Sequence, residues 1–169
     1  MPKAAGPARV ATERPRAGHR FGPALNSSWV EPNAVPIVET VRIRIVYIDD
    51  SVADLRAAVD VLEPAGFDVA THTSSTSAER DLVGADVVLV DYHMPGMHGA
   101  EVVRRLRARL PAGQRTLFYL FTSDRTLSGE YRRLGFDGQV ILKGNSEALL
   151  RQLEAARRAL ALRRLRPAG

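Results

Sequence analysis

The chain contains no cysteine, and this absence removes several kinds of site at once. Without thiols it has no disulfide framework, no zinc–thiolate or iron–sulfur centre and no cysteine nucleophile. Long apolar runs are also missing. The longest, residues 87–90 and 117–121, suit buried strands and fall far short of the roughly 18 residues of a membrane span. The 169 residues suffice for one domain that folds without covalent or metal staples, and we expect no membrane segment.

Lysine is almost absent. Of the 24 basic residues only Lys3 and Lys143 are lysine, and the other 22 are arginine. A chain that uses arginine for nearly every positive surface charge makes its one internal lysine conspicuous. The formal net charge of +5 is modest and spread along the chain, so it does not favour a nucleic-acid-binding protein.

Residues 1–40 differ in composition from the rest of the chain, because they hold six of its ten prolines. No helical or alternating pattern survives that spacing. The segment also lacks the apolar core of a secretory signal and the amphipathic period of a transit peptide. We therefore predict a disordered Pro/Ala/Arg-rich tail at 1–40 and one folded domain at 41–169.

From residue 41 onward, short apolar strands alternate with amphipathic helices. The expected strands are 43–48, 67–71, 86–90, 116–121 and 139–142. The expected helices are 51–63, 76–83, 99–110, 126–134 and a long final helix from 145 or 146 to about 166. Five such alternations predict right-handed βαβ crossovers and a doubly wound α/β fold with a five-stranded parallel sheet.

Polar residues follow the strands at their carboxyl ends, where open α/β sheets bind ligands. They are Asp49 and Asp50, Asp91, Thr122 and Lys143, and the strand order 2-1-3-4-5 would bring them into one cleft. Three carboxylates repel one another, and Mg²⁺, which takes oxygen ligands, would resolve this. An aspartate can attack a phosphoryl group, whose oxygens a lysine and a hydroxyl would hold. The sequence therefore predicts Mg²⁺-dependent phosphorylation of an aspartate.

The segment 91–99, Asp-Tyr-His-Met-Pro-Gly-Met-His-Gly, resembles the phosphoacceptor loop of response-regulator receiver domains, whose pattern is D-x-x-M-P-x-M-x-G. The acidic pair at 49–50, Thr122 and Lys143 match the other signature positions of that family, in order and at close to the usual spacings. The resemblance covers about residues 42–160. It implies the CheY-like, flavodoxin-like (βα)5 fold of two-component signalling proteins.

The resemblance also implies a role for each matched residue. Asp91 would be the phosphoacceptor, while Thr122 and Lys143 would bind the phosphoryl oxygens, Thr122 moving on activation. Gly99 would let the loop turn tightly into the next helix. The remaining ligands of Mg²⁺ beside Asp91 would be Asp50 directly, Asp49 directly or through water, and the backbone carbonyl of His93.

Three departures from the family pattern bear on switching. Gly144 replaces a proline that usually follows a cis peptide bond, so we expect a trans bond and a differently aimed lysine. Gln139 and Val140 lie where the family usually has an aromatic, so the aromatic half of the switch is absent and the signal would use the loop after strand 4. His93 and Asp124 flank the path of an attacking water and would set the rate of dephosphorylation.

Only 26 residues follow Lys143, which is room for one helix. We therefore expect a stand-alone bacterial, cytoplasmic receiver, a signalling module rather than an enzyme. A histidine kinase or phosphotransfer protein would phosphorylate it. It would signal to a downstream protein through the face of helix 4, strand 5 and helix 5, or act as an intermediate or sink in a phosphorelay. The long arginine-rich final helix allows a homodimer.

Three alternatives remain open at this point. A degenerate receiver would bind a partner without phosphorylation, as the glycine at 144 and the missing aromatic suggest. A haloacid-dehalogenase-like enzyme would also use an Asp nucleophile and Mg²⁺, but its second Asp is replaced by His93 and no cap domain is inserted. A nucleic-acid adaptor would use the arginines of the final helix, and a solvated arginine face is the simpler interpretation of them.

Overall fold

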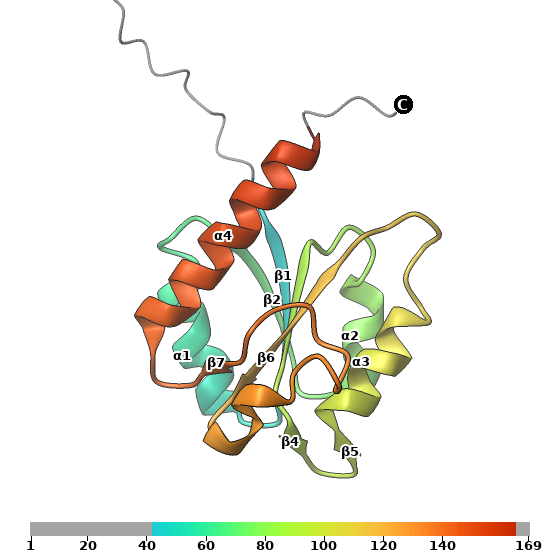
Figure 1. Cartoon of the computed structure of the whole chain (residues 1–169), viewed down its shortest axis with the longest axis vertical. Helices are drawn as coiled ribbons and strands as arrows, with labels where there is room; N and C mark the ends of the chain where they lie inside the picture. Colours follow the sequence, from blue (N-terminus) through green and yellow to red (C-terminus); the bar gives the residue numbers. More distant parts are fainter. Residues whose placement is uncertain (1–41, 165–169) are drawn as a thin grey trace, which may run out of the picture. The chain divides into compact units, whose positions relative to one another are not determined.

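The computed structural model describes residues 42–164, which form an open sheet with helices on both faces (Figure 1). The predicted tail at 1–40 and the end of the final helix lie outside the described residues. The strands are β1 (Arg44–Ile48), β2 (Asp68–His72), β3 (Val87–Val90), β6 (Leu117–Thr122) and β7 (Ile141–Leu142). They pair in parallel in the order β2-β1-β3-β6-β7, which confirms the predicted order 2-1-3-4-5.

The helices cover the two faces of the sheet in pairs. They are α1 (Val52–Leu62), α2 (Ser75–Ala78), α3 (Gly99–Arg107) and α4 (Ser146–Arg164), and α2 continues as the 3-10 turn η1 (Glu79–Asp81). In Figure 1, α1 and α4 lie on one side of the sheet, and α2 and α3 lie on the other. Side-chain caps start the first and last helices: the Ser51 hydroxyl accepts from the Asp54 N–H, and the Asn145 side chain accepts from the Ala148 N–H.

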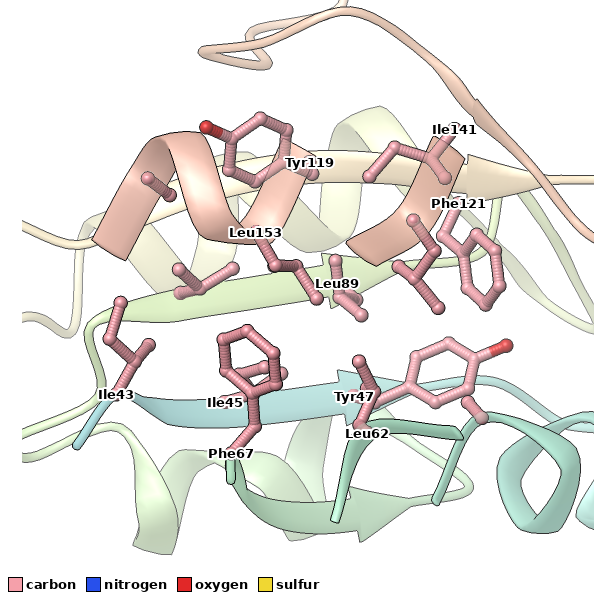
Figure 2. Close-up of a cluster of buried hydrophobic side chains, with 14 of the residues drawn as sticks. Ile43, Ile45, Tyr47, Leu62, Phe67, Leu89, Tyr119, Phe121, Ile141 and Leu153 are labelled. Atoms are coloured by element: carbon pink, nitrogen blue, oxygen red, sulfur yellow. The ribbon is translucent and has the colours of Figure 1, made fainter. Parts of the chain in front are cut away.

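The core consists of two layers, one on each face of the sheet. Along β1, Ile45 and Tyr47 point into the layer under α1 and α4, whereas Val46 and Ile48 point into the layer under α2 and α3. Figure 2 shows the first of these layers. Because β1, β3 and β6 are buried on both faces, their sequences are apolar at nearly every position.

The helix predicted at 126–134 is not an α-helix, which corrects the sequence analysis. The chain forms a short 3-10 turn there, η2 (Arg125–Gly129), followed by further turns up to Gly135. Glycine inside a helix costs about 1 kcal/mol relative to alanine, and Gly135 has a positive φ of 88° that no helix continues. The face expected to carry the signal therefore consists of η2, β7 and α4.

The segment after β3 forms a small hairpin that the sequence analysis did not anticipate. Strand β4 (His93–Met94) pairs antiparallel with β5 (Met97–His98) around a turn at Pro95 and Gly96. Gly96 has a φ of 77°, the conformation that a type II turn demands after proline. The Gly99 N–H donates to the Tyr92 carbonyl at 3.0 Å, so the hairpin brings the start of α3 close to the carboxyl end of β3.

The final helix packs as its sequence predicts. A stripe of four residues is buried against the sheet: Leu149, Leu153, Ala156 and Leu160. Two arginines of α4 are engaged within the chain, since the Arg157 guanidinium lies 4.0 Å from the Phe67 ring centroid and Arg164 pairs with Asp86 at 2.7 Å. Among residues 42–164, no helix has the length and hydropathy needed to cross a bilayer.

Candidate phosphoacceptor and metal site

Neighbouring strands deliver the predicted residues to the carboxyl edge of the sheet. Asp49 follows β1 and Asp91 follows β3, and the pairing of Ile48 with Val90 sets these two aspartates side by side. Thr122 ends β6, and Lys143 follows β7, where its N–H donates to the Thr122 carbonyl. Register alone therefore gathers groups that are up to 94 residues apart in the sequence.

Three carboxylates meet at this edge. Asp49, Asp50 and Asp91 each have an oxygen within 4.8 Å of the others. Asp49 and Asp91 are buried, whereas Asp50 is exposed at the rim. Like charges at this separation repel strongly, so the cluster needs nearby cations. The donor set, all carboxylate oxygen with one open side, fits a hard divalent ion such as Mg²⁺.

Lys143 is the cation that the protein itself supplies. Its Nζ lies 2.7 Å from Asp49 Oδ2, 2.8 Å from Asp54 Oδ2 and 3.1 Å from Asp91 Oδ1, and its side chain is 14% exposed. Burial lowers the pKa of this lysine, but hydrogen bonds to Asp49 and Asp54 and the charge of Asp91 outweigh it, so the pKa is raised above its ordinary value. Lys143 is therefore a permanent positive charge in the site.

Lys143 points into the acidic cluster although a glycine follows it. Gly144 has a φ of 80°, a value that proline cannot adopt because its ring holds φ near −65°. The backbone therefore turns differently here from a loop with proline, and the lysine still reaches Asp91. The expectation of a differently aimed lysine stays a prediction, because this contact shows only that Lys143 reaches Asp91.

Asp91 is held by two donors. One oxygen accepts from the His93 N–H at 3.0 Å, and the other contacts Lys143. Gly99 lies close to the backbone of Asp91 and Tyr92. A Cβ at position 99 would lie 2.7 Å from the Asp91 carbonyl oxygen and 3.0 Å from Tyr92 Cα. Glycine is thus required at position 99 by this close contact rather than by a positive φ. The backbone carbonyl of His93 as a metal ligand stays a prediction.

Thr122 is buried, and among residues 42–164 no hydrogen bond joins its hydroxyl to Asp91. Its hydroxyl oxygen accepts from the Asp124 N–H at 3.2 Å, which leaves the hydroxyl proton free to be donated. Asp124 in turn caps η2, accepting from the N–H of Thr126 at 2.8 Å. The structure therefore brings Lys143 into contact with Asp49 and Asp91, sets Asp50 within 4.8 Å of both aspartates, and places Thr122 at the end of β6.

His93 and Asp124 form a side-chain bridge next to Asp91 and Thr122. His93 Nε2 lies 2.9 Å from Asp124 Oδ2 and links the loop after β3 to the loop after β6. The hydrogen bonds from Thr126 and His93 lower the pKa of Asp124 to about 2. The sequence predicted that both residues flank the acceptor, and the structure joins them.

Two residues of the site were missed in the sequence. Asp54, in the first turn of α1, was assigned no role, although it stands one turn after the Asp49–Asp50 pair. Tyr47 was counted as part of a β-branched and apolar strand, yet its hydroxyl donates to Asp49 Oδ2. A tyrosine two residues before a strand-end aspartate places its side chain on the same face as that aspartate, and this period of two was the available indication.

No aromatic residue stands at positions 139 and 140, but an aromatic side chain of the neighbouring strand lies close by. The ring of Tyr119, on β6, fills the space beside Gly138, where a Cβ would lie only 1.9 Å from the ring. Gln139 is exposed and Val140 is partly exposed, and neither supplies a ring just before β7. An aromatic therefore lies next to β7, but it is a buried core residue of the neighbouring strand.

Residues 45–154 match the sequence model of the response regulator receiver domain. Similar curated proteins include the sensory transduction protein RegX3 of Mycobacterium tuberculosis, 43% identical over 67 residues, and the DNA-binding response regulator MtrA of the same species, 39% identical over 74 residues. These alignments cover 38% and 42% of this chain but only 29% and 32% of the relatives. The chain thus matches about a third of the length of either protein.

Solved structures with the same fold include two bacterial receivers. The chemotaxis protein CheY4 of Vibrio cholerae has a TM-score of 0.58 at 24% identity, and the response regulator TrrA of Thermotoga maritima, solved in complex with Mg²⁺-BeF, has a TM-score of 0.58 at 21% identity. Each alignment covers 68% of this chain and 98% of the other. At these identities the likeness concerns the fold.

Proposed function

The chain belongs to the response regulator receiver domain family, and we propose that it accepts a phosphoryl group on Asp91 in a Mg²⁺-dependent reaction. The observation that carries this proposal is the contact between Lys143 Nζ and Asp91 Oδ1, 3.1 Å long, inside a cluster of three aspartates. A buried carboxylate beside a lysine and an acidic pair that could bind a metal suits attack on a phosphoryl group.

The proposed reaction starts from a phosphohistidine of a histidine kinase or phosphotransfer protein. An Asp91 oxygen attacks the phosphorus, the new O–P bond forms as the P–N bond of the donor breaks, and the departing imidazole nitrogen keeps the electron pair of that bond and takes up a proton from water. Asp50, Asp91 and Asp49, together with the predicted His93 carbonyl, would hold Mg²⁺, which when bound would neutralise the charge of the phosphoryl group.

The residues around Asp91 each do a separate task in this proposal. Lys143 shifts from its carboxylate partners to a phosphoryl oxygen, which brings a positive charge to the transferred group. Thr122 donates its free hydroxyl proton to a second phosphoryl oxygen, and the Asp124 N–H bond holds the threonine oriented for this. The His93 N–H already bound to Asp91 keeps the acceptor carboxylate in one orientation.

The phosphorylated form would act through a protein partner on the face of η2, β7 and α4, in the bacterial cytoplasm. Three further points stay predictions: that the receiver acts without an attached output domain, that it takes part in a phosphorelay, and that it forms a homodimer. Nucleic-acid binding is not favoured, because the net charge of +5 is modest and spread along the chain. Receiver domains are signalling modules, and no separate enzymatic role is proposed.

A degenerate receiver is the second candidate, favoured by the glycine at 144 and by the absence of a ring at positions 139 and 140. It would bind its partner with Asp91 unmodified. The contact of Lys143 with Asp91 weighs against this candidate, since a degenerate site has no need to keep the pair together.

Intact mass after incubation with Mg²⁺ and acetyl phosphate separates the two candidates. We expect one added phosphoryl group on the wild type and on Asp60→Asn, which alters an exposed aspartate of α1, but none on Asp91→Asn. Chelating the metal should abolish the adduct. An unlabelled wild type, beside a receiver that labels under the same conditions, would reject the phosphoacceptor proposal in favour of the degenerate receiver.

A further inference from the structure

Asp49 is restrained by donors on both of its oxygens. Oδ1 accepts from the Ser51 N–H at 2.9 Å. Oδ2 receives two donors, the Tyr47 hydroxyl and the Lys143 ammonium, the latter at 2.7 Å. A carboxylate oxygen has two lone pairs, so Oδ2 is saturated and only one lone pair of Oδ1 is left for a cation or for its water.

The two donors to Oδ2 differ in how firmly they are held. Lys143 is shared with Asp54 and Asp91, and in the proposed reaction it moves to the phosphoryl group. Tyr47 belongs to β1, an inner strand of the sheet, and is fully buried. Its ring packs 5.3 Å from the Phe121 ring, centroid to centroid, with the two ring planes tilted by 57°, and Figure 2 shows the two rings beside each other in the core layer. Tyr47 is therefore the donor that stays.

We propose that Tyr47 is a positioning residue of the metal site, whose hydroxyl holds Asp49 Oδ2 so that the carboxylate presents Oδ1 to the cation in both the free and the phosphorylated protein. The proposal rests on the function proposed above and goes beyond it by assigning a role to a buried core side chain. The other residues that β1 directs into this layer, such as Ile45, have no polar atom to offer.

The simpler interpretation is that a buried tyrosine takes the nearest acceptor and that only its ring matters. The two interpretations differ in what removal of the oxygen does. If the hydroxyl positions a metal ligand, its loss loosens Asp49 and weakens the metal, since loss of such outer contacts typically reduces metal affinity about 10-fold to 100-fold. If only the ring matters, phenylalanine preserves the metal affinity.

The test is the dissociation constant of Mg²⁺, measured by titration calorimetry without a phosphodonor on the wild type, Tyr47→Phe and Tyr119→Phe. Tyr119 is the matched control because it is a buried tyrosine of the same core layer, and its ring packs against Gly138. We expect Tyr47→Phe to bind Mg²⁺ about 10-fold more weakly than the wild type, and Tyr119→Phe to bind it equally. Unchanged or tighter binding by Tyr47→Phe overturns the proposal.

Whether the Tyr47 hydroxyl acts on Mg²⁺ binding through Asp49 is tested by introducing Tyr47→Phe into the Asp49→Asn variant. Tyr47→Phe should then change the Mg²⁺ affinity by less than in the wild-type background, because the ligand it positions is altered. An equal loss in both backgrounds would mean that the hydroxyl acts elsewhere. A wild type that binds no Mg²⁺ would instead remove the metal site itself, and with it both this inference and the proposed function.

A measurement on the wild type keeps the inference testable if Tyr47→Phe does not fold. The Tyr47 hydroxyl proton is buried and hydrogen-bonded, so it should give a slowly exchanging proton resonance. Addition of Mg²⁺ should shift this resonance in step with binding, because its acceptor Asp49 contacts the cation or its water. A resonance that stays in place at saturating Mg²⁺ would contradict the inference.

Discussion

Lys143 donates to Asp54 across 2.8 Å and thereby joins the loop after β7 to the first turn of α1. The two residues are 89 positions apart in the sequence. Asp54 is the most exposed of the three carboxylates around the ammonium, with 42% of its side chain accessible. It is therefore the partner that Lys143 gives up most easily when a phosphoryl group arrives.

Asp54→Ala should accelerate phosphorylation of Asp91 by acetyl phosphate about twofold to fivefold. The substitution removes a competitor for Lys143, and an exposed ion pair contributes up to about 1 kcal/mol. The measurement is a time course of intact mass at a fixed Mg²⁺ concentration. Asp60→Ala, an exposed aspartate on the same helix, is the control and should follow the wild type. A slower Asp54→Ala would mean that this carboxylate assists the reaction.

The bridge between His93 and Asp124 should lengthen the lifetime of the phosphoryl group. It joins two residues whose backbone N–H groups bond Asp91 and Thr122, and we expect it to limit the approach of water to the phosphorylated Asp91. We expect His93→Ala and Asp124→Ala each to lose the phosphoryl group several-fold faster. The double variant should be no faster than the faster single one, because both remove the same contact.

The decay is followed by intact mass after the phosphodonor is removed. His98→Ala serves as the control, since His98 pairs with His93 in the hairpin and stacks on Tyr92 without reaching Asp124. Equal lifetimes for the wild type and both single variants would show that the bridge does not shield the site. Additive effects would show that the two residues act separately.

Gly99→Ala should damage the site, and Gly129→Ala should not. A Cβ at position 99 would lie 2.7 Å from the Asp91 carbonyl oxygen, whereas a Cβ at position 129 meets nothing within 4 Å. Overpacking of this kind costs about 1–3 kcal/mol, partly offset by the better helix propensity of alanine. We expect Gly99→Ala to lower the free energy of unfolding and to slow phosphorylation. Chemical denaturation and the labelling time course test both, and equal stabilities of the two variants would contradict this.

His72 should make the protein less stable in mild acid. Its side chain is 3% exposed, and its Nε2 lies 3.0 Å from Asp81 in a poorly aligned pair. Burial lowers the pKa of His72 below 6.5, although Asp81 partly opposes this. The unfolded chain then binds a proton at a pH where the folded protein does not, so stability falls as the pH drops below about 6.5 and continues to fall down to the folded-state pKa.

Urea denaturation at pH 7.5 and 5.5 tests this pH dependence. His72→Gln should lose less stability between the two values than the wild type, because glutamine takes up no proton. His98→Gln, at an exposed histidine, should keep the dependence of the wild type. An identical dependence in the wild type and His72→Gln would assign the acid sensitivity to other groups.

The parts of the fold that could be predicted are those with dense local information. The two strands that end just before Asp49 and Asp91 were located to within one residue, because burial on both faces of a sheet requires continuous apolar runs. The segment 126–134 could not be resolved in this way. Its apolar residues permit a helix, and the outcome was decided by two glycines and by the Asp124 cap of a tighter turn.

The sequence by itself determined which residues reach the edge of the sheet: Asp49, Asp50, Asp91, Thr122 and Lys143 stand at strand ends, and parallel strands end at one edge. Only the tertiary structure decided which partners these side chains contact. The lysine contacts Asp54 on α1, the Tyr47 hydroxyl takes one oxygen of Asp49, and His93 meets Asp124. Such contacts depend on side-chain directions across neighbouring elements, and residue spacing along the chain does not encode them.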